Sequence, residues 1–285
     1  MRLVIDANQV ADIVNAGSPR KSRPTLVIAP LIWAEIVNGS RHHLDSRLKA
    51  LGEYDLLFGM DYAHMCVQLC CLNEHEIREF VPVFAPHTRA HKALLRAFHS
   101  PRKEHFQRAD ELRQNASRER QRLLCWVRQR RKENSDARSR GDALEIEEFA
   151  TIEEADLRFI SGKNARLRTA LVAQVTQNNS REIRAASPES LYEAMPANPS
   201  IRRFLRLKIT FDLAYLDQWG SDTLNAIGDL QAERNDLPDI LLALFAREGD
   251  TILTNDRRLQ TALRHCDPVG KVGVSTWVSH FQRLS

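Results

Sequence analysis

Four acidic side chains near the two ends of the chain have the type and setting that metal chemistry requires. Asp6 and Asp256 each follow a short apolar run, and Glu35 and Asp239 each lie in the first turns of a helical segment. Carboxylates gathered in one place repel one another unless a cation lies among them. Mg²⁺ and Mn²⁺ take oxygen ligands, and such an ion activates water for attack on a phosphodiester. The four acids therefore predict a Mg²⁺ or Mn²⁺ site for phosphodiester hydrolysis.

Each acid also has an ordinary structural explanation. Asp6 and Asp256 can cap the helices that follow them, because Asp is among the preferred N-cap residues. Asp236 and Asp239 can form a capping arrangement at a helix N-terminus, where the helix dipole favours negative charge. Glu35 can be an acid on a helix surface. The metal site is favoured because all four acids occur together, at strand ends and helix starts.

Short apolar runs bounded by turn residues predict strands at both ends of the chain. The expected strands are Leu3–Ile5, Thr25–Ala29, Tyr54–Phe58, Thr251–Thr254 and Lys271–Ser275. Pro30 and Pro238 stand at the first positions of expected helices, where a missing N–H has no cost. If the strands are parallel, the four acids converge on one edge of the sheet, beyond the carboxyl ends where function gathers in such sheets.

The middle of the chain is mostly helical in character. Helices are expected over residues 63–80 and 92–98, and a loop over 178–200, where Asn, Ser and Pro gather; a further helix is expected over 223–234. Neither end has enough strands to form a stable sheet alone. We therefore expect residues 1–61 and 211–285 to form one discontinuous α/β domain, with residues 62–210 as a mostly helical insertion.

Four segments, in this order, resemble the motifs of the PIN-domain family of metal-dependent nucleases. They are LVIDAN at residues 3–8, APLIWAEIVNG at 29–39, DILLALFAREGDTILTND at 239–256 and KVGVSTWVSHFQRL at 271–284. Each motif alone is weakly specific, whereas all of them in the right order are more so. The match covers about residues 1–61 and 220–285.

The resemblance implies a three-layer α/β/α sandwich with a central parallel sheet, interrupted here by the insertion. It implies that Mg²⁺ or Mn²⁺ is held by the four acids described above. Asn8 and Thr254 match polar residues that the family has near the metal. The interval between Asp239 and Asp256 is one residue shorter than is common, so Asp236 is a second candidate.

The resemblance also implies a substrate and a partner. The family typically cleaves RNA, and many members are toxins that a protein antitoxin neutralises, so a protein inhibitor is an implied partner. The insertion of well over a hundred residues is unlike the compact toxins. It favours a specialised substrate or partner over the antitoxin arrangement.

A basic stretch within the insertion is a candidate nucleic-acid surface. Residues 102–140 contain 13 Lys and Arg residues against 6 Asp and Glu residues, with Trp126 and Phe106 among them. Lys and Arg contact phosphates, and aromatic rings stack on unpaired bases. The alternative is a solvated helix face with ion pairs such as Glu119 with Arg122. The cations expected to bind nucleic acid are Arg118, Arg122, Arg128, Arg130, Arg131 and Lys132.

Composition and short motifs limit the other classes of protein to which the chain could belong. The five cysteines form no C-x-x-C pair, which favours free thiols in the cytoplasm. No apolar run approaches membrane-spanning length, and no phosphate-binding loop or serine nucleophile motif occurs. We expect a cytoplasmic endoribonuclease acting on RNA or other single-stranded nucleic acid. The alternatives are a scaffold module that acts through the insertion and a DNA-directed nuclease.

Overall fold

A parallel sheet of five strands organises the protein and confirms the expected α/β class. The computed structural model describes residues 1–16, 23–38, 43–140, 147–177, 187–220, 223, 236–267 and 270–282. The strand order is β3-β2-β1-β4-β5, and every pairing is parallel. The strands are β1 (Arg2–Ile5), β2 (Thr25–Ile28), β3 (Asp55–Phe58), β4 (Thr251–Leu253) and β5 (Gly273–Ser275). All five expected strands are therefore present, and both ends of the chain contribute to one sheet.

The central strand β1 joins the two ends of the chain. Its last residue, Ile5, is in register with Ile28 of β2 and with Leu253 of β4. Leu3, Val4 and Ile5 are completely buried, as a strand covered on both faces requires. The chain leads outward from β1 through β2 and β3, then returns to the other side of β1 with β4. Between β1 and β4 the sheet therefore has a topological switch point, the usual place for ligand sites in open α/β sheets.

The helices of the α/β part connect these strands. Arg2, at the start of β1, donates from Nη2 to the backbone oxygen of Phe245 at 3.2 Å. The last turn of α13 therefore lies at the amino edge of the sheet, and its first turn lies toward the carboxyl edge. The helices are α1 (Val10–Ala16), α2 (Pro30–Asn38), α3 (Leu44–Leu51), α13 (Asp236–Phe245), α14 (Arg257–Cys266) and α15 (Trp277–Gln282), with the 3-10 turn η1 (Ala7–Gln9).

The middle of the chain is helical, as expected, but two details differ. The helix expected over 63–80 is broken, because the side chains of Asn73 and Glu76 form a capping box that starts a new helix. A helix also occupies part of the loop expected over 178–200, while residues 178–186 and 224–234 lie outside the described chain. The elements are α4 (Tyr62–Cys71), α5 (Glu74–Glu79), α6 (Arg89–His99), α7 (Lys103–Ser139), α8 (Ile152–Asp156), the π-helical turn η4 (Leu157–Ser161), α9 (Arg166–Gln177), α10 (Pro188–Ala197) and α11 (Pro199–Tyr215).

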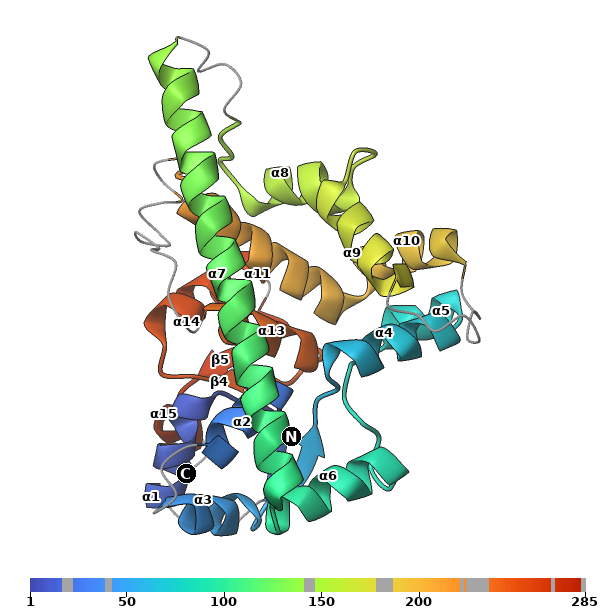
Figure 1. Cartoon of the computed structure of the whole chain (residues 1–285), viewed down its shortest axis with the longest axis vertical. Helices are drawn as coiled ribbons and strands as arrows, with labels where there is room; N and C mark the ends of the chain where they lie inside the picture. The colour runs from blue at the N-terminus through green and yellow to red at the C-terminus, as the bar shows by residue number, and fades with distance from the viewer. Residues whose placement is uncertain are drawn as a thin grey trace.

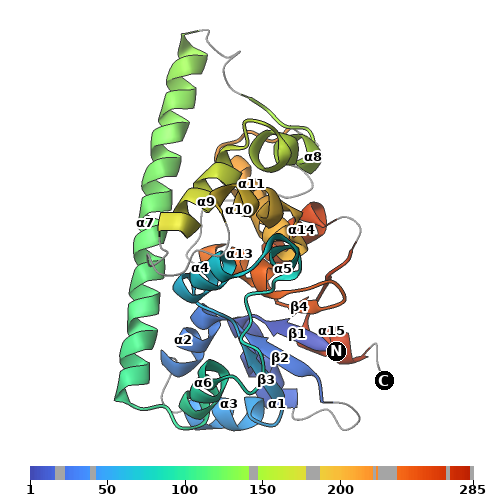
Figure 2. The ribbon, with the colours of Figure 1, turned by 90° about the vertical axis from the view of Figure 1, so that its right-hand side faces the viewer.

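Helix α7 runs along the long axis of the molecule (Figures 1 and 2). It packs against α2 and also contacts α13. Near its start, Asp110 accepts a hydrogen bond from Asn38 of α2 at 2.9 Å. Farther along, the Arg131 guanidinium donates to the backbone oxygen of Tyr215 at the end of α11. Although α7 has 37 residues, no helix within the described ranges is both long and apolar enough to cross a membrane.

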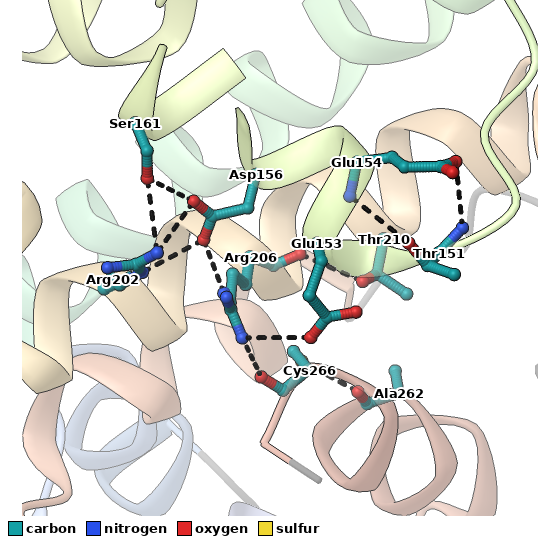
Figure 3. A network of polar contacts seen from close by, with 10 residues as sticks. All are labelled: Thr151, Glu153, Glu154, Asp156, Ser161, Arg202, Arg206, Thr210, Ala262 and Cys266. Carbon is teal, nitrogen blue, oxygen red and sulfur yellow. Dashed lines mark hydrogen bonds and ion pairs between the residues drawn. The ribbon is translucent and has the colours of Figure 1, made fainter. Parts of the chain in front are cut away.

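A buried ionic network ties the helical middle to the α/β part (Figure 3). Asp156, at the end of α8, accepts hydrogen bonds from Arg206 at 2.5 Å and Arg202 at 2.9 Å, both on α11, and from Ser161. Arg206 also donates to the backbone oxygen of Cys266 in α14 at 3.5 Å. Helix α11 packs against both α13 and α14, and its apolar side chains belong to the same core cluster as the sheet. The insertion and the sheet therefore share one core.

Candidate functional site

Asp6 lies at the topological switch point, one residue beyond β1. Its backbone N–H donates to the oxygen of Leu253 at 3.0 Å, which extends the β1–β4 pairing to the carboxyl edge. The strand ends there because the next residues turn into η1. The residue is 5% exposed, so its carboxylate is held within the edge of the sheet rather than in open solvent.

Two neighbouring side chains fix the orientation of the Asp6 carboxylate. Thr254 donates from Oγ1 to Oδ2 at 2.7 Å, and Asn8 donates from Nδ2 to the same oxygen at 2.5 Å. Asn8 belongs to η1, directly after β1, whereas Thr254 directly follows β4. Residues from the two ends of the chain therefore converge on a single carboxylate.

Asp256 lies close to Asp6 and starts α14. Its Oδ1 accepts from the backbone N–H groups of Arg258 at 2.7 Å and Leu259 at 3.1 Å, so it is the N-cap of that helix. The backbone N–H of Asp256 donates to Thr254 Oγ1 at 3.0 Å. One hydroxyl thus bridges the two acidic residues. Asp256 therefore caps α14, which is its ordinary structural explanation, and it also lies beside Asp6.

The electrostatic setting of Asp6 is unfavourable for its charged form. Burial raises the pKa of the Asp6 carboxyl, and the negative charge of Asp256 raises it further. Hydrogen bonds from Thr254 and from the backbone N–H of Ala7 partly offset this rise. A buried carboxylate beside a second one is stabilised by a cation between them.

Glu35 and Asp239 lie on the two helices that flank this edge. Glu35 is half-buried on α2, which begins at Pro30 just after the carboxyl end of β2. Asp239 is 5% exposed and lies in the first half of α13, the half toward the carboxyl edge. The structure thus places one acid on each neighbouring helix. The side chain of Asp236 lies outside the described part of the chain.

The Asp6–Asp256 pair has the donor set that a hard divalent cation uses. Among the residues that the structure describes, no three acidic, histidine or cysteine side chains form a group that could hold a metal ion. Mg²⁺, however, is commonly bound through one or two carboxylates, with waters and substrate phosphates as its other ligands. Asp6 and Asp256 bring two carboxylates together at this edge, and burial of Asp6 raises the pKa of its carboxyl.

The six cations expected to bind nucleic acid divide into two groups on α7. Arg122 pairs with Glu119 at 2.5 Å, and Arg130 pairs with Glu133 at 2.9 Å. The first is the ion pair expected if this part of α7 is a solvated helix face. Arg131 is held by Tyr215, as described above. The other three are exposed and make no ion pair within the described ranges: Arg118, Arg128 and Lys132.

Two residues of this edge were missed by sequence reasoning. Asn255 donates from its backbone N–H to Asn8 Oδ1 at 3.0 Å and from Nδ2 to Asp12 at 3.0 Å. Gln9 donates to the same oxygen of Asn8 at 3.0 Å and accepts from the backbone N–H of Trp277 at 2.6 Å. The only signal in the sequence was their position next to Asn8 and Asp256. Together they fix the loops that carry the two acids.

Comparison of the chain with protein-family models, curated proteins and solved structures finds no match.

Proposed function

We propose that this chain is a Mg²⁺- or Mn²⁺-dependent endoribonuclease with a PIN-like three-layer α/β/α arrangement around its sheet. The observation that carries the proposal is the convergence of Asp6 and Asp256, from opposite ends of the chain, at the topological switch point. Glu35 and Asp239 complete the proposed ligand set from the flanking helices. The motif resemblance and the expected chemistry of clustered carboxylates point to the same four residues.

In this proposal the protein side chains that would bind the ion are already held in position in its absence. The chemistry that a bound ion supplies is a water nucleophile at neutral pH and neutralisation of charge on the phosphate. Thr254 and Asn8 hold Asp6 by two hydrogen bonds, so this ligand needs little reorganisation. Asp256 is held by the first turn of α14. RNA reaches the site from the carboxyl edge of the sheet.

The test is cleavage of total RNA by wild-type protein and by Asp6→Asn and Asp256→Asn variants in Mg²⁺ or Mn²⁺. Asn is also a preferred N-cap, so Asp256→Asn preserves the start of α14. Loss of several kcal/mol of transition-state stabilisation corresponds to a rate reduction of about 100-fold or more. Asp55→Asn is the matched control, because Asp55 is an exposed carboxylate at the amino end of β3. Wild-type rates in the Asp6→Asn and Asp256→Asn variants would refute the assignment.

Two alternatives remain and the same samples separate them. A scaffold or binding module that acts through α7 is favoured by the exposed, unpaired cations on that helix. It predicts nucleic-acid binding without cleavage and no heat of Mn²⁺ binding in a calorimetric titration. A DNA-directed nuclease predicts faster cutting of DNA than of RNA when matched oligonucleotides are compared.

A further inference from the structure

One face of α7 is turned toward the rest of the protein. Its buried and half-buried residues recur every three or four positions, which is the spacing of one face of a helix. All but one of them between residues 106 and 127 are apolar. The members of this inward stripe are Phe106, Ala109, Leu112, Ala116, Arg120, Leu123 and Val127, and Leu124 at its border is also half-buried. Arg120 is thus a cation in a position where the helix otherwise has apolar contacts.

Arg120 lies between the two anchors of α7. Asp110 is bonded to Asn38 of α2, and Arg131 is bonded to Tyr215 of α11. At 1.5 Å per residue these anchors are about 31 Å apart along the helix, and Arg120 is about 15 Å from the first. Helix α7 also contacts α13, which carries Asp239 and packs on β1. Arg120 therefore lies on the inward face of α7, between its anchor on α2, the helix that carries Glu35, and its anchor on α11.

The guanidinium of Arg120 has a buried hydrogen-bond donor without a partner in the structure. Its Nε is buried and has no hydrogen-bond partner, although the residue as a whole remains partly exposed. No acid of the described chain forms an ion pair with it, unlike Arg122 and Arg130 on the same helix. A buried donor without a partner costs about 1–3 kcal/mol. An Arg side chain binds a phosphate through two parallel hydrogen bonds, which would satisfy this donor.

We infer that Arg120 binds a backbone phosphate of the nucleic-acid substrate as it lies across the carboxyl edge. This assignment rests on the proposed nuclease function and adds a substrate-binding residue to it. Arg138 is exposed, makes no ion pair in the described part of the chain and is not among the cations expected to bind nucleic acid. It lies about 27 Å farther along α7 than Arg120, so it is the control cation on the same helix.

The test compares Arg120→Gln with Arg138→Gln in binding a short, labelled, single-stranded RNA oligonucleotide in EDTA, so that no cleavage occurs. Fluorescence anisotropy is recorded over a series of salt concentrations. We expect Arg120→Gln to weaken binding about ten-fold, the loss of one charged hydrogen-bonded contact. The slope of log K against log salt should fall by about 0.7, the value for one phosphate on a single strand. Arg138→Gln should change neither quantity, and Arg120→Lys should restore most of the slope.

The outcome separates this inference from the proposed function. Equal binding by Arg120→Gln and wild type, or an equal loss in Arg138→Gln, overturns the role of Arg120. Loss of affinity with an unchanged salt slope also overturns it, because a merely structural defect does not remove a phosphate contact. The proposed function is judged independently, by whether Asp6→Asn abolishes metal-dependent cleavage. A cooperative thermal unfolding transition in each Gln variant establishes that both are folded.

Discussion

Replacing Asp156 by Asn should destabilise the protein, because this carboxylate is buried against two arginines. Its side chain is 3% exposed, that of Arg206 is 18% exposed and that of Arg202 is 42% exposed. Removing one partner of a buried ion pair costs about 3–5 kcal/mol. Arg202 can turn toward water, so we take the lower end, about 3 kcal/mol.

This loss converts into a measurable change in melting temperature. The unfolding entropy per residue, applied to 285 residues, is about 0.6 kcal mol⁻¹ K⁻¹ in total, so 3 kcal/mol lowers the midpoint by about 5 °C. Glu153→Gln is the matched control. Glu153 lies 3.8 Å from Arg206, but its side chain is 62% exposed. An exposed pair contributes at most about 1 kcal/mol, so this control should shift the midpoint by less than about 2 °C. Differential scanning calorimetry measures both, and equal midpoints for the two variants would contradict the reasoning.

The same carboxylate predicts a pH dependence of stability. Burial alone would raise the pKa of Asp156, but hydrogen bonds from Ser161, Arg206 and Arg202 outweigh it, so the pKa is lowered. A carboxyl whose pKa is lower in the folded state stabilises the fold above its unfolded pKa of about 3.9. This stabilisation is lost as the pH falls through the folded pKa. The difference in midpoint between wild type and Asp156→Asn should therefore be full near neutral pH and shrink below about pH 4. A constant difference across that range would exclude titration of Asp156 as the cause.

Two further predictions concern packing and thiol reactivity. Gly59→Ala should lower stability by about 1–3 kcal/mol, because a Cβ there would lie 2.5 Å from the Phe245 ring; calorimetry measures this. In the native protein a thiol reagent at mildly alkaline pH should modify the exposed Cys71 and Cys125 but not Cys266. Burial raises the pKa of the Cys266 thiol to about 12, so it should react only after denaturation, as mass spectrometry of labelled peptides would reveal.

The sequence was sufficient for the strands, because β1 to β4 contain short apolar runs that the core buries, and the half-buried β5 follows the same pattern of an apolar residue between turn residues. It also identified Asp6 and Asp256 as candidates, since each directly follows such a run. It did not show where α4 ends, because residues 63–80 have helical spacing throughout. The break between α4 and α5 depends on the capping box that Asn73 and Glu76 form. It placed a loop where α10 forms, because Ser187 and Pro188 mark a helix start as readily as a loop.

Only the tertiary structure decided which distant residues meet. That Thr254 donates to Asp6 depends on the pairing of β1 with β4, whose strands come from opposite ends of the chain. That Arg118 is exposed and Arg120 is half-buried depends on which face of α7 packs against the protein. Local sequence fixes the type of element and the chemistry of each side chain, because these depend on neighbouring residues. Contacts between distant residues depend on how the whole chain packs, so they appear only in the folded molecule.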